Sequence, residues 1–227
     1  MKKFSIALLA VLSLSTIASA AVLGCGAAGN LATNTFLCNG VTFDNLSAIE
    51  GSTGGGYTIA PGTNISASVD GVVNVVGGVA TITFSLDASA IANQWNLAGA
   101  QQSAFDLFYT ATSRVGPFSS VSNQQNSSRT GQGSNQITKD ICTATCPPFG
   151  GNYLTSIVTT DATPFGSVGI PAQNILFIHE NVQQAASSGT ATLTSFSNTL
   201  GTPEPMSMGL MGFGLLAVGF FGRRFKK

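Results

Sequence analysis

Hydrophobic and polar residues alternate with a period of two in several stretches of the chain. From Val79 to Leu86, every second residue is Ala, Ile, Phe or Leu, and the residues between them are Thr or Ser. This period is typical of a strand with one buried face. Similar short runs predict further strands at 35–37, 41–43, 65–69, 72–76, 105–112, 136–141, 154–160, 175–182 and 190–200.

Turn residues separate several of these runs. Asn39-Gly40, Asp70-Gly71 and Gly77-Gly78 each predict a two-residue hairpin turn, so 65–86 is expected to form a three-stranded meander. Residues 88–104 are compatible with one short helix, and 119–135, rich in Ser, Asn, Gln and Gly, predict a mobile loop. Many short strands predict an all-β domain, a β-sandwich or jelly roll, over residues 21–202.

The first twenty residues have the three parts of a secretory signal peptide. Lys2 and Lys3 precede an apolar stretch over 4–17, and small residues at Ala18 and Ala20 predict cleavage after Ala20. The expected partners are the Sec translocon and signal peptidase. An alternative is that residues 22–25 act as a lipobox, which would make Cys25 a lipidated first residue.

The other end of the chain predicts a single transmembrane helix. Residues 206–222 are 17 uncharged, mostly apolar residues, which is the short limit for crossing a hydrocarbon core of about 30 Å. The basic residues that follow should stay in the cytoplasm, which places the upstream chain outside; these are Arg223, Arg224, Lys226 and Lys227. A buried core helix is the alternative, against which five glycines argue.

Directly before this run lies Pro203-Glu204-Pro205, whose prolines hold the glutamate in an extended segment. The order of this motif, a Gly-rich apolar run and a basic tail over 203–227 resembles the PEP-CTERM sorting signal of exported bacterial proteins. The resemblance implies a Gram-negative bacterium that makes exopolysaccharide. It also implies that an exosortase-type membrane protease recognises the motif and releases the protein to the envelope or extracellular matrix. A permanent anchor is the simpler alternative.

Three stretches within the middle region, at 37–46, 137–141 and 189–200, are similar to a recurring group of exported PEP-CTERM proteins. In that group a cysteine is followed by a Gly, Phe and Asn pattern. The resemblance implies a β-sandwich without a known biochemical role. The pair Cys142 and Cys146 departs from the group's pattern, so the local loop is not predicted by it.

Four cysteines in an exported chain favour two disulfides. Three pairings are possible, and sequence proximity favours Cys25 with Cys38 and Cys142 with Cys146. The second pair needs a bend, which the nearby prolines and glycines make plausible. Metal binding by Cys142 and Cys146 is the alternative, but no histidine lies near them in the sequence.

Charged residues are only 8% of the chain, and the region between the two terminal segments contains three basic and eight acidic residues. This excludes a basic nucleic-acid surface. His179 is the sole histidine and is expected to be a satisfied, half-buried strand residue on the same face as Phe177. No nucleophile elbow or P-loop occurs, and the match of 24–29 to G-x-G-x-x-G lies too close to the signal peptide to follow a buried strand. We therefore expect no enzyme activity, cofactor or metal.

These observations predict an exported cell-surface or matrix protein that is not an enzyme. A module that binds carbohydrate, ice or another surface is the alternative, with exopolysaccharide as a candidate ligand. It rests on threonines that would share one strand face, at Thr81 and Thr83 and at Thr190, Thr192 and Thr194. A secreted hydrolase, which would have to use His179, is the third hypothesis.

Overall fold

The computed structural model describes residues 21–30, 33–50, 69–86, 96–99, 101–144, 146 and 153–202. Within these ranges every regular element is a strand. The strands are β1 (Ala21–Leu23), β2 (Ala28–Asn30), β3 (Asn34–Cys38), β4 (Val41–Glu50), β5 (Val69–Val76), β6 (Val79–Leu86), β7 (Asn96–Ala98), β8 (Gln101–Ser113), β9 (Phe118–Cys142), β10 (Thr155–Thr160), β11 (Phe165–Gln173) and β12 (Ile175–Gly201).

The predicted terminal signals lie outside the described residues. These are the cleavage residues Ala18 and Ala20, the motif Pro203, Glu204 and Pro205, the apolar run 206–222, and the basic residues Arg223, Arg224, Lys226 and Lys227. For the described residues between them, the all-β prediction is confirmed.

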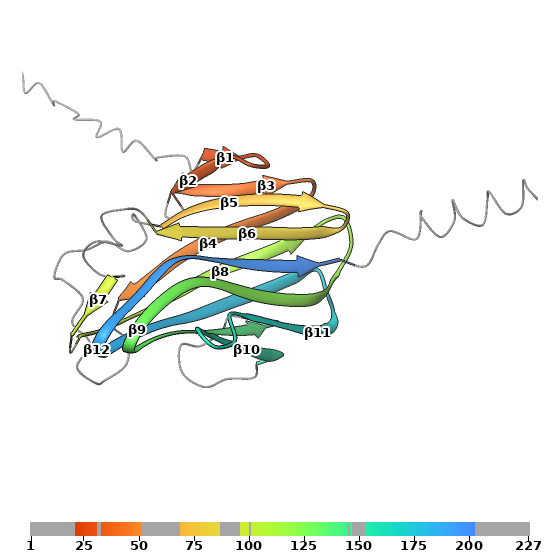
Figure 1. Cartoon of the computed structure of the whole chain (residues 1–227). Coiled ribbons are helices and arrows are strands. Elements are labelled where there is room, and N and C mark those ends of the chain that lie inside the picture. Colours follow the sequence, from red (N-terminus) through yellow and green to blue (C-terminus); the bar gives the residue numbers. More distant parts are fainter. Residues whose placement is uncertain are drawn as a thin grey trace, which may run out of the picture.

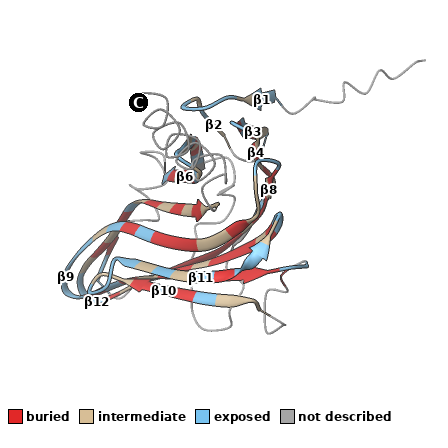
Figure 2. Ribbon diagram, turned by 90° about the vertical axis from the view of Figure 1, so that its right-hand side faces the viewer, coloured by how far each residue is buried: buried red, intermediate tan, exposed pale blue. Residues whose placement is uncertain are grey.

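The fold is organised around β9 and β12, two long antiparallel strands that pair along almost their whole lengths (Figure 1). The pairing is irregular near the middle of β12, between Ala186 and Gly189 and again between Leu193 and Ser195. At this point the paired strands fold over on themselves, as Figure 2 shows at the end of the molecule where both are labelled. We call β9 and β12 together the folded ribbon.

Each half of the folded ribbon belongs to a different layer. The first layer contains β11, residues 118–130 of β9, residues 190–201 of β12, then β6, β5 and β2. The second layer contains β10, residues 131–142 of β9, residues 175–189 of β12, then β8, β4, β3 and β1. The two layers face each other across one apolar core, in the manner of a β-sandwich.

Glycines permit the fold in the ribbon. Gly131 and Gly189 are paired with each other and have φ angles of 54° and 104°, which residues with a Cβ rarely adopt. Gly133 lies so close to the facing strand that an added Cβ would sit 1.9 Å from the carbonyl oxygen of Thr190. The bend therefore requires residues without side chains at these positions.

The core is built from the inward positions of alternating strands, which appear as repeated red segments in Figure 2. Phenylalanines from both layers fill it, and the ring of Phe84 lies 5.0 Å from Phe196 and 5.4 Å from Tyr109. The largest apolar side chains in the core are Phe36, Phe43, Phe84, Phe105, Phe118, Phe196, Ile82, Leu107 and Ile137.

Several local predictions are confirmed. The strand Val79–Leu86 has the predicted bounds, and the turn before it is formed by Gly77 and Gly78, both with positive φ. The turn at Asn39 and Gly40 also forms, with φ angles of 45° and 82°. The runs predicted at 105–112, 136–141 and 154–160 fall within or overlap β8, β9 and β10.

The predicted turn at Asp70-Gly71 is wrong. Both residues lie inside β5, where Gly71 pairs with Phe84 of β6 on one side and with Gly29 of β2 on the other. Neighbours on both sides hold the backbone extended, so the dipeptide does not reverse the chain. The part of the predicted meander at 65–68 lies outside the described residues.

The predicted mobile loop at 119–135 is also wrong, because these residues are part of β9. Their backbone pairs with β12 on one side and, up to Gln124, with β11 on the other, which compensates for the low strand propensity of their side chains. The runs at 175–182 and 190–200 belong to one strand, β12. In the described part of 88–104, the chain forms β7 and the start of β8 instead of the short helix.

Candidate functional site

Four charged side chains are buried in the described part of the chain: Asp106, Lys139, Asp140 and Glu180. They come from three neighbouring strands of the second layer, β8, β9 and β12. Because consecutive residues of a strand point to opposite faces, Lys139 and Glu180 face the core, whereas Asp140 and His179 face the other way. The four charges therefore form two separate groups.

The first group, which we call the inner cluster, contains Lys139, Glu180, Asn198 and Tyr109. Lys139 Nζ donates to Asn198 Oδ1 at 2.7 Å and to the Ser122 carbonyl oxygen at 3.2 Å. Asn198 Nδ2 donates to Glu180 Oε1, which also accepts from Tyr109 OH at 3.0 Å. The Asn198 carboxamide thus lies between the amine and the carboxyl group.

The inner cluster is isolated from solvent. Lys139, Glu180 and Asn198 are all 0% exposed. Burial lowers the pKa of Lys139 to about 8, although the negative charge of Glu180 would raise it. Burial also raises the pKa of Glu180, against the opposing effects of Lys139 and of the hydrogen bonds from Tyr109 and Asn198. Both shifts favour the uncharged forms of the amine and the carboxyl group.

The second group holds His179 between two carboxylates. His179 Nε2 lies 2.8 Å from Asp106 Oδ1, and Nδ1 lies 3.2 Å from Asp140 Oδ2. The ring of Phe108 stacks on the imidazole at 4.7 Å. Burial alone would lower the pKa of His179, but the two carboxylates outweigh it and raise the pKa to about 9. His179 is therefore protonated at neutral pH. It is satisfied by two partners, as expected, but it is buried rather than half-buried.

This geometry bears on the hydrolase hypothesis. A histidine that activates a serine needs one ring nitrogen directed at the hydroxyl. In the described residues both ring nitrogens of His179 contact carboxylates instead. The arrangement suits charge compensation and does not suit a general base.

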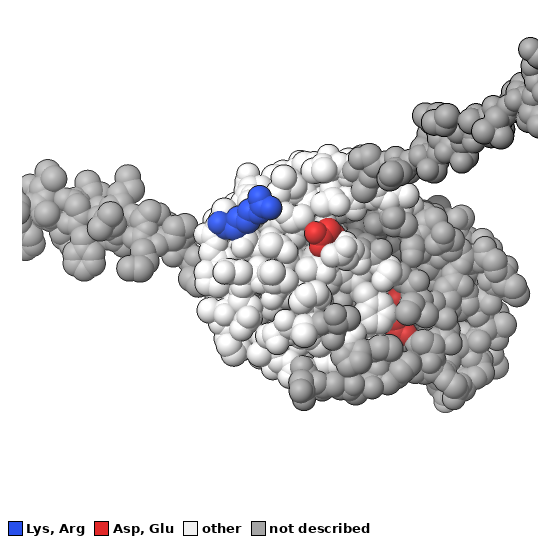
Figure 3. All heavy atoms as spheres, turned by 180° about the vertical axis from the view of Figure 1, so that it is seen from behind, with Lys and Arg blue, Asp and Glu red and all other residues white. Residues whose placement is uncertain are grey.

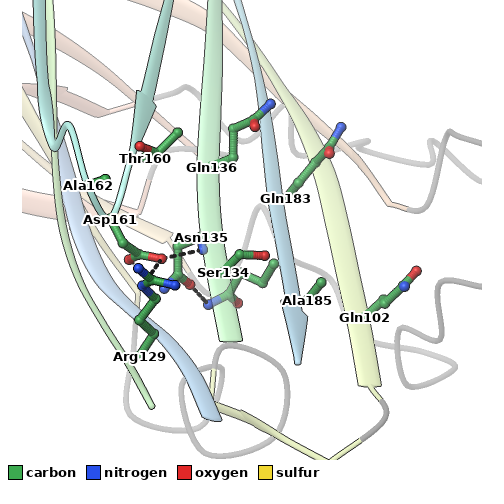
Figure 4. A pocket seen from close by; sticks show the side chains of 11 residues that line it. Gln102, Arg129, Ser134, Asn135, Gln136, Thr160, Asp161, Ala162, Gln183 and Ala185 are labelled. Atoms are coloured by element: carbon green, nitrogen blue, oxygen red, sulfur yellow. Dashed lines mark hydrogen bonds and ion pairs between the residues drawn. The ribbon is translucent and has the colours of Figure 1, made fainter. Parts of the chain in front are cut away.

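A polar pocket of about 290 Å³ is lined by residues of β8, β9 and β12 and by the segment 160–162 (Figure 4). Its organising group is Asp161, which accepts hydrogen bonds from Ser127 Oγ at 2.6 Å and from the backbone and side-chain nitrogens of Asn135 at 2.7 and 2.9 Å. Arg129 Nε lies 3.8 Å from the same carboxylate. The charged groups of the pocket are thus engaged with one another.

Four glutamines line this pocket, and Gln102, Gln136 and Gln183 among them come from three adjacent strands (Figure 4). Gln136 of β9 is directly opposite Gln183 of β12, and Gln102 of β8 lies opposite the neighbouring Ala185. Amide groups both donate and accept hydrogen bonds, as hydroxyl-rich ligands require. This pocket was not predicted, because its residues lie within the segment expected to be a loop or come from elements that are distant in sequence.

The disulfides have the predicted pairing. Cys25 is bonded to Cys38, and Cys142 is bonded to Cys146, with Cα separations of 4.7 and 5.6 Å. The alternatives of a metal at Cys142 and Cys146 and of lipidation at Cys25 both need thiols that these bonds engage. Among the described residues no group of three or more His, Cys, Asp or Glu side chains is arranged to hold a metal ion.

The predicted threonine rows are present on outward, partly exposed positions of β6 and β12. Thr81 bonds to Thr199 at 3.2 Å, and Thr190 bonds to Thr130 at 2.9 Å. These threonines therefore bond in pairs across neighbouring strands, which is an ordinary way to stabilise a sheet.

The inner cluster was not predicted from the sequence, although the sequence carries a signal for it. Each of its charged or amide members interrupts an alternating apolar run at an inward position. Lys139 lies between Ile137 and Ile141, Glu180 between Ile178 and Val182, and Asn198 between Phe196 and Leu200. Three such interruptions indicate three polar groups that must satisfy one another inside the core.

The described surface is poor in charge. In Figure 3 almost all the described atoms of one face are uncharged. Within the described ranges, none of the elements is a helix of the length and hydrophobicity that membrane crossing requires.

Comparison with known proteins identifies no family for this chain. No family model matches it, and no curated protein does. Among solved structures, the chain is similar to the glycosylation associate protein (Gap123) complex from Streptococcus agalactiae, with 12% identity and a TM-score of 0.30. The match covers 58% of this chain and 22% of that one, and a likeness of this size carries no argument about function.

Proposed function

We propose that the protein is exported and acts outside the cell as a non-enzymatic β-sandwich of the surface or extracellular matrix. The observation that carries the proposal is the pairing of all four cysteines in disulfides within a compact β domain. Disulfides persist in oxidising compartments and are rare in the cytosol. The signal peptide expected at 1–20 agrees with this location.

In this proposal the C-terminal segment is a temporary anchor. The last described residue is Thr202, and the motif Pro203-Glu204-Pro205 follows it directly. The sheet would thus be folded up to the point of cleavage, while the apolar run 206–222 holds the protein at the membrane with its basic end in the cytoplasm. An exosortase-type protease would then release the domain to the envelope or matrix.

The intact mass of the protein recovered from spent medium tests this proposal. We expect a chain without residues 1–20 and without the segment after the sorting motif, with four cysteines oxidised. A matched variant in which Pro203, Glu204 and Pro205 are all alanine should remain in the membrane fraction at a larger mass. Recovery of the full-length chain from the cytosol, with reduced thiols, would overturn the proposal.

A second candidate is that the pocket around Asp161 binds a carbohydrate such as exopolysaccharide. The observation that favours it is the row of glutamine amides on three adjacent strands at the pocket's rim. In a pull-down with the producing organism's exopolysaccharide, we expect binding by the wild type and a loss of at least tenfold when Gln136 and Gln183 are both changed to alanine.

The matched control for this test is Gln124→Ala, which removes an exposed glutamine of β9 that does not line the pocket. It should bind like the wild type. The carbohydrate hypothesis would fail if the exopolysaccharide retained the double variant as well as the wild type. It would also fail if a denatured sample were retained as well as the folded wild type.

A further inference from the structure

The inner cluster has the composition of a reaction centre. A buried amine donates to the carbonyl oxygen of a buried carboxamide at 2.7 Å, and the nitrogen of the same carboxamide donates to a buried carboxyl group. We propose that Lys139 and Asn198 join in an intramolecular isopeptide bond, formed by the folded chain itself with Glu180 as the proton-transfer residue.

The contacts of Lys139 fit a neutral amine. Two acceptors, Asn198 Oδ1 and the Ser122 carbonyl oxygen, match the two N–H groups of a neutral amine, whose lone pair then stays available as a nucleophile. In the part of the chain that the structure describes, no carboxylate lies within ion-pair distance of Nζ. A buried ammonium without such a partner would cost several kcal/mol. Burial shifts the pKa of Lys139 downward, to about 8, in the direction of this state.

The contacts of Glu180 fit the complementary role. Oε1 accepts hydrogen bonds from Asn198 Nδ2 and Tyr109 OH, while Oε2 is buried and has no partner among the described residues. If Glu180 were ionised, Oε2 would carry part of the negative charge with no hydrogen-bond donor or cation to compensate it. A protonated carboxyl group avoids this, and it places an acid beside the nitrogen that must leave. Tyr109 is a positioning residue that fixes the orientation of the carboxyl group.

The reaction balances without a further reactant. The Lys139 Nζ lone pair attacks Asn198 Cγ, and Glu180 transfers a proton from the attacking nitrogen to Nδ2, acting first as base and then as acid or in the reverse order. The bond between Cγ and Nδ2 breaks, and ammonia leaves. The products are one amide between the two side chains and one molecule of ammonia, and Glu180 returns to its starting state.

The fold explains why the two side chains meet. Lys139 comes from the second layer and Asn198 from the first, so each belongs to a different half of the folded ribbon. They are separated by 59 residues in sequence. The bond would therefore fasten the two layers to each other across the core, at a position held by the apolar residues that flank each member of the cluster.

Mass spectrometry of the purified, reduced and denatured full chain tests the proposal. The wild type should be lighter than its sequence mass by one ammonia. Trypsin should fail to cleave after Lys139, and after additional cleavage at Glu180 the peptide with Lys139 should remain joined to the peptide with Asn198. The joined peptides distinguish the bond from loss of ammonia within Asn198 alone.

Variants assign the roles. Glu180→Gln keeps the shape of the side chain and both reactants, and should abolish the joined peptide while leaving the folded far-UV spectrum. Asn198→Asp should still join, with loss of water instead of ammonia, and Asn198→Ala should not join. Asn123→Ala, which removes the buried amide directly opposite Asn198 on β9, is the matched control and should join like the wild type.

The wild-type measurement decides the proposal even if a variant fails to fold. A wild-type chain at its full sequence mass, cut by trypsin after Lys139, would overturn it. A joined peptide of unchanged yield in folded Glu180→Gln would overturn the role of Glu180.

Discussion

At the scale of single residues, this protein places its few charges in unusual positions. Four of its described ionisable Asp, Glu and Lys side chains are buried, two beside His179 and two in the inner cluster. Asp106 and Asp140 bracket His179, so a protonated imidazole interacts with both carboxylates and offsets one of their two negative charges. Protonation of His179 is therefore coupled to the stability of the fold.

This coupling predicts a pH dependence. The pKa of His179 is about 9 in the folded protein, against an ordinary value of 6.5. The stability that protonated His179 adds to the fold is therefore complete below pH 6.5 and is lost as the pH rises through 9. The difference corresponds to roughly 3 kcal/mol. Urea unfolding at pH 6 and at pH 9.5 should show a larger loss of stability for the wild type than for His179→Gln. An equal loss of stability in the two proteins would contradict a protonated His179 held between Asp106 and Asp140.

At the scale of elements, the folded ribbon determines the architecture. The same two strands supply a part of both layers, and the change of layer occurs where Gly131 and Gly189 face each other. A bend of this kind tolerates little added volume, because backbone approaches backbone directly.

Gly133→Ala should therefore be strongly destabilising. Its Cβ would meet the Thr190 carbonyl oxygen at 1.9 Å, and backbone atoms must move to relieve the clash. We expect a loss of roughly 2 kcal/mol or more in the free energy of unfolding, measured with urea. The matched control is Gly169→Ala in β11, where the nearest atom would be 3.9 Å away. If both variants have the stability of the wild type, the backbone at Gly133 does not approach the Thr190 carbonyl oxygen this closely.

Sequence patterns predicted those strands whose signal, an alternation of apolar and polar residues and an adjacent turn, lies within one short segment. Val79–Leu86 is such a case, since its alternation and its glycine turn are both local. The segment 119–135 was missed because its polar side chains have low strand propensity, and only the pairing with β12 and β11 makes it a strand. Strand pairing brings Gln136 beside Gln183, whereas Lys139 meets Asn198 only because the folded ribbon packs its two halves face to face.

At the scale of the whole molecule, two disulfides close loops of different length, one near the start of the described domain and one after β9. Cys25–Cys38 closes 13 residues and attaches the connection between β1 and β2 to the end of β3. Cys142–Cys146 closes only 4 residues at the end of β9. A longer closed loop restricts the unfolded chain more.

Removal of the two disulfides should accordingly have unequal effects. Changing Cys25 and Cys38 to serine should lower the free energy of unfolding by about 3 kcal/mol, and changing Cys142 and Cys146 by about 2 kcal/mol. Denaturant unfolding of the two double variants under oxidising conditions measures this order. The reverse order would show that contacts around the cysteines, instead of loop closure, set the effect.

The end of β12 has a mechanical consequence. Gly201 pairs with Val79 on one side and Ser120 on the other, and Thr202 bonds to Gly78, so the chain leaves the domain from an interior strand. Force applied through a tether at that point acts along β12 and loads its flanking hydrogen bonds together, since these bonds run perpendicular to the strand. They must then yield collectively in shear, whereas an edge strand would peel away one bond at a time. Under the proposed anchoring through the C-terminal segment, the domain would therefore resist fluid drag without its strands separating one by one.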